Sequence, residues 1–145
     1  MNSLNQSNNL TKDGLVRLIL ACCALYYFVA AFAHFFGLTL FPFYDETLYS
    51  PYHDILLGLC DLVFVMIFSV VAFDPVNNID TFHVILIAFV LVILVNIGLI
   101  WKFDFALYHS VHKQFQTIVE TLLAFITLVS LWILRPATKK MTRKH

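Results

Sequence analysis

The chain has 145 residues, of which 61% are hydrophobic and only 12% are charged. A soluble globular protein carries roughly 25% charged residues, so this composition excludes a water-soluble domain and indicates a single domain surrounded by lipid. Nine basic and nine acidic residues give a formal net charge of zero. That balance argues against nucleic acid as a partner, because no basic excess is present to neutralise phosphates.

Four apolar stretches have about the 20 residues that a helix needs to cross a bilayer. In chain order they lie at about 15–40, 55–73, 82–101 and 115–134. We therefore predict an all-α integral membrane protein, an antiparallel four-helix bundle formed by residues 15–135. A polar N-terminal segment, 1–14, precedes the bundle and a basic tail, 136–145, follows it.

The basic residues predict how the spans are oriented. Five of them lie at 135–144, and Lys12 and Arg17 flank the first span, whereas the segment 41–54 contains none. Cytoplasmic loops of membrane proteins carry an excess of lysine and arginine. Both termini are therefore expected to be cytoplasmic, with the segments 41–54 and 102–114 on the outer side.

A cleaved signal peptide is an alternative interpretation of the first apolar stretch. Lys12 and Arg17 would form its charged region, 18–30 its apolar core, and Ala31-Phe32-Ala33 its cleavage site. The apolar run continues as far as Leu40. That length favours a span that is retained.

Each predicted span contains one strongly polar side chain. These side chains are His34, Asp61, Asn96 and Glu120. At 1.5 Å per residue, all four lie roughly 8–10 Å below the outer ends of their predicted spans. Ionisable residues inside a membrane usually face the interior of a bundle and pair with one another. We therefore expect the four to converge as a buried polar layer in the outer half of the bundle.

A second polar set lies above this layer, near the outer ends of the second and fourth spans. It consists of His53, Asp54, His109 and His112. Histidine is a common metal ligand and also titrates near neutral pH. These residues are the candidates for binding a metal ion or a haem, although the sequence identifies no cofactor.

The three cysteines all lie in apolar stretches and lack the spacing of a zinc or redox site. The adjacent Cys22 and Cys23 resemble the cysteine pair of mercury-type transporters, in which two thiolates hold a soft metal. No second pair follows to receive the ion. Small side chains that pack within the bundle are the favoured interpretation.

The polar layer is open to three interpretations of function. The first is structural: hydrogen bonds across the bundle fix its packing, and the protein is an accessory, assembly or interaction subunit without catalysis of its own. The second is a proton or cation transporter, and the third is a site for a metal, haem or quinone. We favour the first, with the lipid bilayer and a larger complex or a homo-oligomer as partners.

The plan of the chain resembles the DoxX-like group of small bacterial four-span proteins. The matching residues are Leu15-Val16-Arg17-Leu18 at the start of the first span and Ala72-Phe73-Asp74-Pro75 at the end of the second. The resemblance implies a four-span protein of the bacterial inner membrane, and some members of the group are linked to quinone-coupled sulfur oxidation. The glycine-rich span interiors of the group are missing here, and no catalytic residue can be matched.

Overall fold

The computed structural model describes residues 2–38, 50–105 and 111–136, and these residues form four helices. The helices are α1 (Asn2–Phe36), α2 (Pro51–Phe73), α3 (Ile79–Lys102) and α4 (Val111–Ile133). Each contains a stretch long and apolar enough to cross a membrane: Lys12–Phe36, Pro51–Phe73, Ile79–Lys102 and Lys113–Ile133. The predicted all-α class with four membrane-length helices is therefore confirmed.

Helix α1 is longer at its start and shorter at its end than the predicted span 15–40. It is helical from Asn2, so the polar segment 1–14 forms its first turns. It ends at Phe36 because Gly37 adopts a left-handed conformation with φ of 60°. The amide of Leu38 then donates to the carbonyl of Ala33 at 3.0 Å, the hydrogen bond of a Schellman motif.

The other three helices begin three or four residues before their predicted spans. Pro51, whose fixed φ suits the first turn of a helix, starts α2, and α3 and α4 begin at Ile79 and Val111. The polar residues of these first turns lie outside the apolar windows that defined the predicted spans. At its other end α2 stops at Phe73 as predicted, and Asp74 accepts a hydrogen bond from the amide of Asn77 at 3.0 Å.

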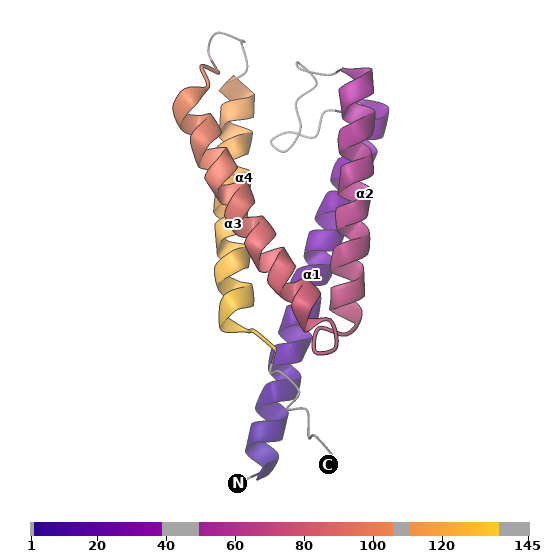
Figure 1. Cartoon of the computed structure of the whole chain (residues 1–145), viewed down its shortest axis with the longest axis vertical. Helices are drawn as coiled ribbons and strands as arrows, with labels where there is room; N and C mark the ends of the chain where they lie inside the picture. Colours follow the sequence, from indigo (N-terminus) through magenta and orange to yellow (C-terminus); the bar gives the residue numbers. More distant parts are fainter. Residues whose placement is uncertain (1, 39–49, 106–110, 137–145) are drawn as a thin grey trace.

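The four helices are arranged as two pairs. Helix α1 lies along α2 and α3 lies along α4, whereas contacts between the pairs are confined to a few residues. Figure 1 shows that the pairs meet near the turn between α2 and α3 and part toward the other end. The expected bundle is therefore closed at one end only. We call the end near Val16, Val71 and Phe82 the closed end, and the end near Phe36 and Lys102 the open end.

The apolar core lies at the closed end. Its buried side chains come from all four helices, and they are Val16, Leu20, Ala24, Phe68, Val71, Phe82, Ile85, Leu86, Phe89, Ala124 and Leu131. Tyr27 and Phe64 pack against this core on the side of the open end, with ring centroids 5.1 Å apart. An aromatic layer thus separates the core from the polar residues above it.

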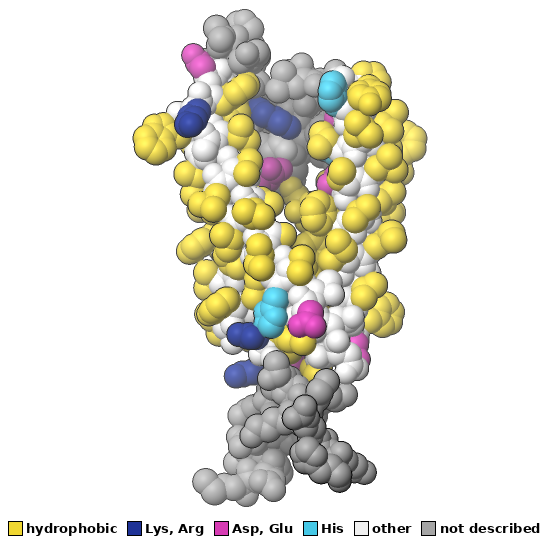
Figure 2. All heavy atoms as spheres, in the orientation of Figure 1, with side chains coloured by type: hydrophobic (Ala, Val, Ile, Leu, Met, Phe, Trp, Pro, Cys, Tyr) yellow, Lys and Arg dark blue, Asp and Glu magenta, His cyan; other side chains and the backbone are white. Residues whose placement is uncertain are grey.

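Large apolar side chains cover most of the outer surface. Phe73 and Trp101, at the ends of their helices, are 82% and 86% exposed. Figure 2 shows apolar side chains over the length of both helix pairs. An apolar surface of this extent is stable only in contact with lipid or another protein, so the helices contact a bilayer.

Candidate functional site: a polar layer between the helix pairs

His34 and Asp54 join α1 to α2 near the open end. Nδ1 of His34 lies 2.7 Å from Oδ1 of Asp54, and the Asp54 side chain is buried. The other carboxylate oxygen, Oδ2, accepts a hydrogen bond from the backbone amide of Ser50 at 2.7 Å. Because both oxygens of Asp54 are engaged, this carboxylate is held in one orientation at the start of α2.

Asp61 lies two turns further along α2, on the other side of the same imidazole. Its Oδ2 is 4.0 Å from Nε2 of His34, within ion-pair range but longer than a hydrogen bond. The side chains of His34 and Asp61 are 17% and 16% exposed. His34 therefore directs one ring nitrogen at Asp54 and the other toward Asp61, so that a single imidazole serves two carboxylates.

Glu120 connects the two helix pairs. Its Oε1 accepts one hydrogen bond from the hydroxyl of Tyr26 on α1, at 3.2 Å, and another from Nε2 of Gln116 on α4, at 2.8 Å. These two donors hold the carboxyl group of Glu120 between α1 and α4. Glu120 also interacts electrostatically with Asp61, so the polar layer includes acidic groups of both α2 and α4.

Figure 2 shows where this layer lies on the molecule. A recess separates the helix pairs toward the open end, and acidic side chains lie on its walls. Glu120 and Asp61 are only partly buried, which is consistent with side chains that border a recess.

The other predicted polar residues contribute less. Asn96 lies on α3, partly buried, and no hydrogen bond of its side chain is found within the described part of the chain. His53 is exposed, with its Nδ1 3.0 Å from Oγ of Ser50. His109 lies outside the described residues, and the side chain of His112 is likewise not described. The structure therefore brings together His34, Asp54 and Asp61 and places Glu120 near them.

Sequence reasoning missed Tyr26 and Gln116 as members of this layer. Tyr26 precedes His34 by eight residues, about 12 Å along a helix, and looks like one more aromatic residue in an apolar span. Gln116 precedes Glu120 by one turn, a spacing that places both on one helix face. This spacing could have identified Gln116 as a member of the layer. The role of Tyr26 could not be identified in this way, because it depends on how α1 crosses α4.

Metal binding is not supported by the described residues. Among the side chains that the structure describes, in 12–38, 50–105 and 113–136, no three of histidine, cysteine, aspartate or glutamate are placed to hold a metal ion together. Of the three cysteines, Cys22 and Cys60 are exposed and Cys23 is half-buried, so the expectation that all three pack within the bundle is wrong for Cys22 and Cys60.

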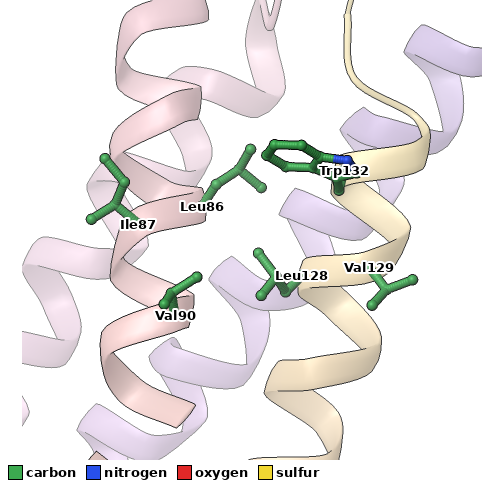
Figure 3. A pocket seen from close by; sticks show the side chains of 6 residues that line it. All are labelled: Leu86, Ile87, Val90, Leu128, Val129 and Trp132. Carbon is green, nitrogen blue, oxygen red and sulfur yellow. The ribbon is translucent and has the colours of Figure 1, made fainter. Parts of the chain in front are cut away.

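A separate apolar pocket lies between α3 and α4, in the half of the molecule that contains the core. Figure 3 shows its lining, which consists of Leu86, Ile87, Val90, Leu128, Val129 and Trp132. Its volume is about 310 Å³. No charged side chain lines this pocket, so it suits the acyl chain of a lipid. The ionisable side chains lie instead in the polar layer, which is therefore the candidate functional site.

Comparison with known proteins gives no further assignment: no protein-family model, no curated protein and no solved structure matches the chain.

Proposed function

We propose that this small polytopic membrane protein binds and releases a proton or another cation at its polar layer. The observation that carries the proposal is the imbalance of charge between the helix pairs. Asp54 and Asp61 lie 2.7 Å and 4.0 Å from the imidazole of His34, and a third carboxylate, Glu120, interacts electrostatically with Asp61. Lys113 and Lys102 lie nearer the open end, in the first turn of the α4 span and the last turn of α3.

A charge without an opposite charge beside it is costly inside a membrane. This cost determines which ions the polar layer is expected to bind. Moving a carboxylate out of water costs several kcal/mol unless an opposite charge accompanies it. A protonated His34 would compensate one of the three carboxylates. The remaining negative charge favours the uptake of protons or of a cation from the open end, which is the behaviour expected of intramembrane carboxylates in ion-handling proteins.

The orientation of the chain is part of the proposal. The distribution of lysine and arginine favours cytoplasmic termini, and this would turn the open end and its acidic layer toward the outer side. We further propose the bacterial inner membrane as the location, and membership of the DoxX-like group, on the resemblance of 15–18 and 72–75. With this orientation the layer would exchange cations with the extracytoplasmic side.

Infrared difference spectra recorded between low and high pH test the proposal. A carboxylic acid in an apolar recess has a C=O stretch at higher frequency than one in water. We expect high-frequency bands in the unmodified protein that are lost in part in Asp61→Asn and in part in Glu120→Gln. Each substitution removes one titrating carboxyl while keeping the size of the side chain.

Asp80→Asn is the matched control for these spectra. Asp80 is exposed in the first turn of α3, so its carboxyl is solvated and its removal should leave the high-frequency bands unchanged. If the high-frequency bands keep their full intensity in both layer variants, the layer does not exchange protons. The same conclusion follows if the unmodified protein lacks these bands.

One observation favours a second function, that of an accessory or assembly subunit. The helix pairs part toward the open end (Figure 1), and among the described residues α2 and α3 contact each other at only a few positions. A helix of a larger complex, or of a second copy, would fill this space. Purification in a mild detergent with measurement of the particle mass tests it, since a subunit should retain a stoichiometric partner and a protein that acts alone should not.

A further inference from the structure

A groove lies between α1 and α2 at the closed end of the molecule. Its volume is about 410 Å³, and its lining consists of Arg17, Ala21, Ala24, Ser69, Ala72 and Phe73. Five of these six side chains are small or apolar, and the sixth ends in a guanidinium group. The groove therefore differs in chemistry from the pocket between α3 and α4, which is lined by apolar side chains throughout.

Arg17 stands at the depth where α2 ends. It lines the groove together with Phe73, the last residue of α2, and the polar turn 74–78 follows directly. Exposed turns do not occur within the hydrocarbon of a bilayer, so this level is the headgroup boundary. From Arg17 the groove extends along α1 past Ala21 and Ala24, toward the apolar interior of the membrane.

No carboxylate of the described residues compensates the charge of Arg17. The ion pairs found within the described part of the chain are those of His34, near the open end. Asp13 lies one turn before Arg17 on α1 but is not among those pairs. Both carboxylate oxygens of Asp74 accept hydrogen bonds from Asn77. The guanidinium of Arg17, an exposed residue, can therefore bind an anion that comes from outside the chain.

The occupant of the groove must combine a negative charge with an apolar chain. A helix that covered the groove with apolar side chains alone would bury an unpaired guanidinium, which is strongly unfavourable. Inorganic phosphate would neutralise Arg17 but leave the apolar part of the groove uncovered. A phospholipid brings both components, because its phosphate matches the fork of an arginine and its acyl chains suit apolar walls.

We propose that this groove binds an anionic phospholipid, with the phosphate on the guanidinium of Arg17 and an acyl chain along the alanines of the lining. Lys12 is exposed nearer the start of α1 and adds positive charge on the headgroup side. A net negative headgroup is therefore preferred over a zwitterionic one. The site lies at the end of the molecule opposite to the polar layer, so it is independent of the proposed cation binding.

Native mass spectrometry of the full chain, titrated in mild detergent with phosphatidylglycerol or phosphatidylcholine, tests the inference. We expect tighter binding of phosphatidylglycerol, whose headgroup has a net negative charge. Arg17→Gln should weaken this binding about fivefold, the effect of one basic residue beside an anionic headgroup. Arg135→Gln is the matched control and should bind normally, because Arg135 is exposed just after α4 and does not line the groove.

Ala21→Leu tests the apolar part of the site. Ala21 is exposed and lines the groove, so a leucine side chain at this position should occupy the space of the acyl chain and weaken the binding of both lipids. Cys22→Leu is the matched control. Cys22 is also exposed but does not line the groove, so this substitution should leave lipid binding unchanged.

Three results would overturn the inference. Equal affinity of the unmodified protein for the two lipids would show that the headgroup charge is not recognised, and this comparison does not depend on how a substitution affects folding. Equal losses in Arg17→Gln and Arg135→Gln would indicate diffuse attraction to a basic surface rather than a site. A dimer that Ala21→Leu dissociates would assign the groove to a second copy of the chain.

Discussion

Replacing His34 with alanine is expected to lower the free energy of unfolding by about 3 kcal/mol, because removing one partner of a buried charged pair costs about 3–5 kcal/mol. The imidazole is 2.7 Å from Oδ1 of Asp54, a residue that is only 5% exposed. Without it, the carboxylate stays buried between α1 and α2 with less compensation. Unfolding by titration with a denaturing detergent, followed by circular dichroism, measures the change.

His53→Ala is the control for this prediction. His53 is exposed, and its described contacts are with its near neighbours in the chain, the Ser50 hydroxyl and the ring of Tyr52, so the free energy of unfolding should change by less than about 0.5 kcal/mol. The double variant His34→Ala/Asp54→Asn should recover part of the loss, since a neutral amide tolerates burial better than a carboxylate. A His34→Ala variant as stable as the unmodified protein would mean that the pair does not hold α1 against α2.

Replacing Gly58 with leucine is expected to force α1 and α2 apart, with a loss of about 2 kcal/mol, within the range of about 1–3 kcal/mol typical of overpacked sites. A Cβ atom at this position would lie 3.1 Å from Cε1 of Phe35 and 3.2 Å from the backbone oxygen of Ala31. The phenyl ring can turn aside, but the backbone oxygen moves only if the whole helix moves. The same unfolding measurement detects the loss.

Gly98→Leu provides a matched control on α3. A Cβ atom there would meet nothing within 4 Å, so the substitution brings the same gain in helix propensity without the collision. We expect Gly98→Leu to be neutral or slightly stabilising. Equal effects of the two substitutions would contradict the close approach of α1 and α2 at Gly58.

The spans could be predicted from the sequence because their cause is local. A run of apolar residues defines each helix, and Asp74-Pro75 ends α2 at the predicted residue. The ends that were misplaced depend on backbone geometry and on polar first turns: Gly37 stops α1 at Phe36, and the polar residues after Val111 belong to α4. A hydropathy profile contains no information on a left-handed glycine or on a polar first turn of a helix.

The polar layer was only partly predictable. Depth along each helix suggested that His34, Asp61 and Glu120 lie at one level, and the structure does place Asp61 beside His34 and within electrostatic reach of Glu120. The partner of Glu120 is nevertheless Tyr26, two turns away from His34 on α1. That contact depends on the angle at which the helix pairs diverge, which no periodicity in the sequence encodes.

The divergence itself follows from how polar groups are distributed along the inward faces. Near the closed end these faces carry Phe82, Leu86 and Leu131, which are buried in the apolar core. Toward the open end they carry carboxylates, and burying these groups against apolar neighbours would be costly. The carboxylates that keep the helix pairs apart therefore also line the recess in which the proposed cation binds.

Crosslinking between α1 and α4 tests most directly whether the polar layer is shared by the two helix pairs. After replacement of Cys22, Cys23 and Cys60 by alanine, the double variant Tyr26→Cys/Glu120→Cys is treated with a short bifunctional thiol reagent and digested for mass spectrometry. The described contact of 3.2 Å between Tyr26 and Glu120 predicts an intramolecular crosslink. It also predicts none for Tyr26→Cys/Leu122→Cys, because Leu122 is 57% exposed on the outer surface. Crosslinks of equal yield in both variants, or in neither, would contradict a polar layer shared by the two pairs.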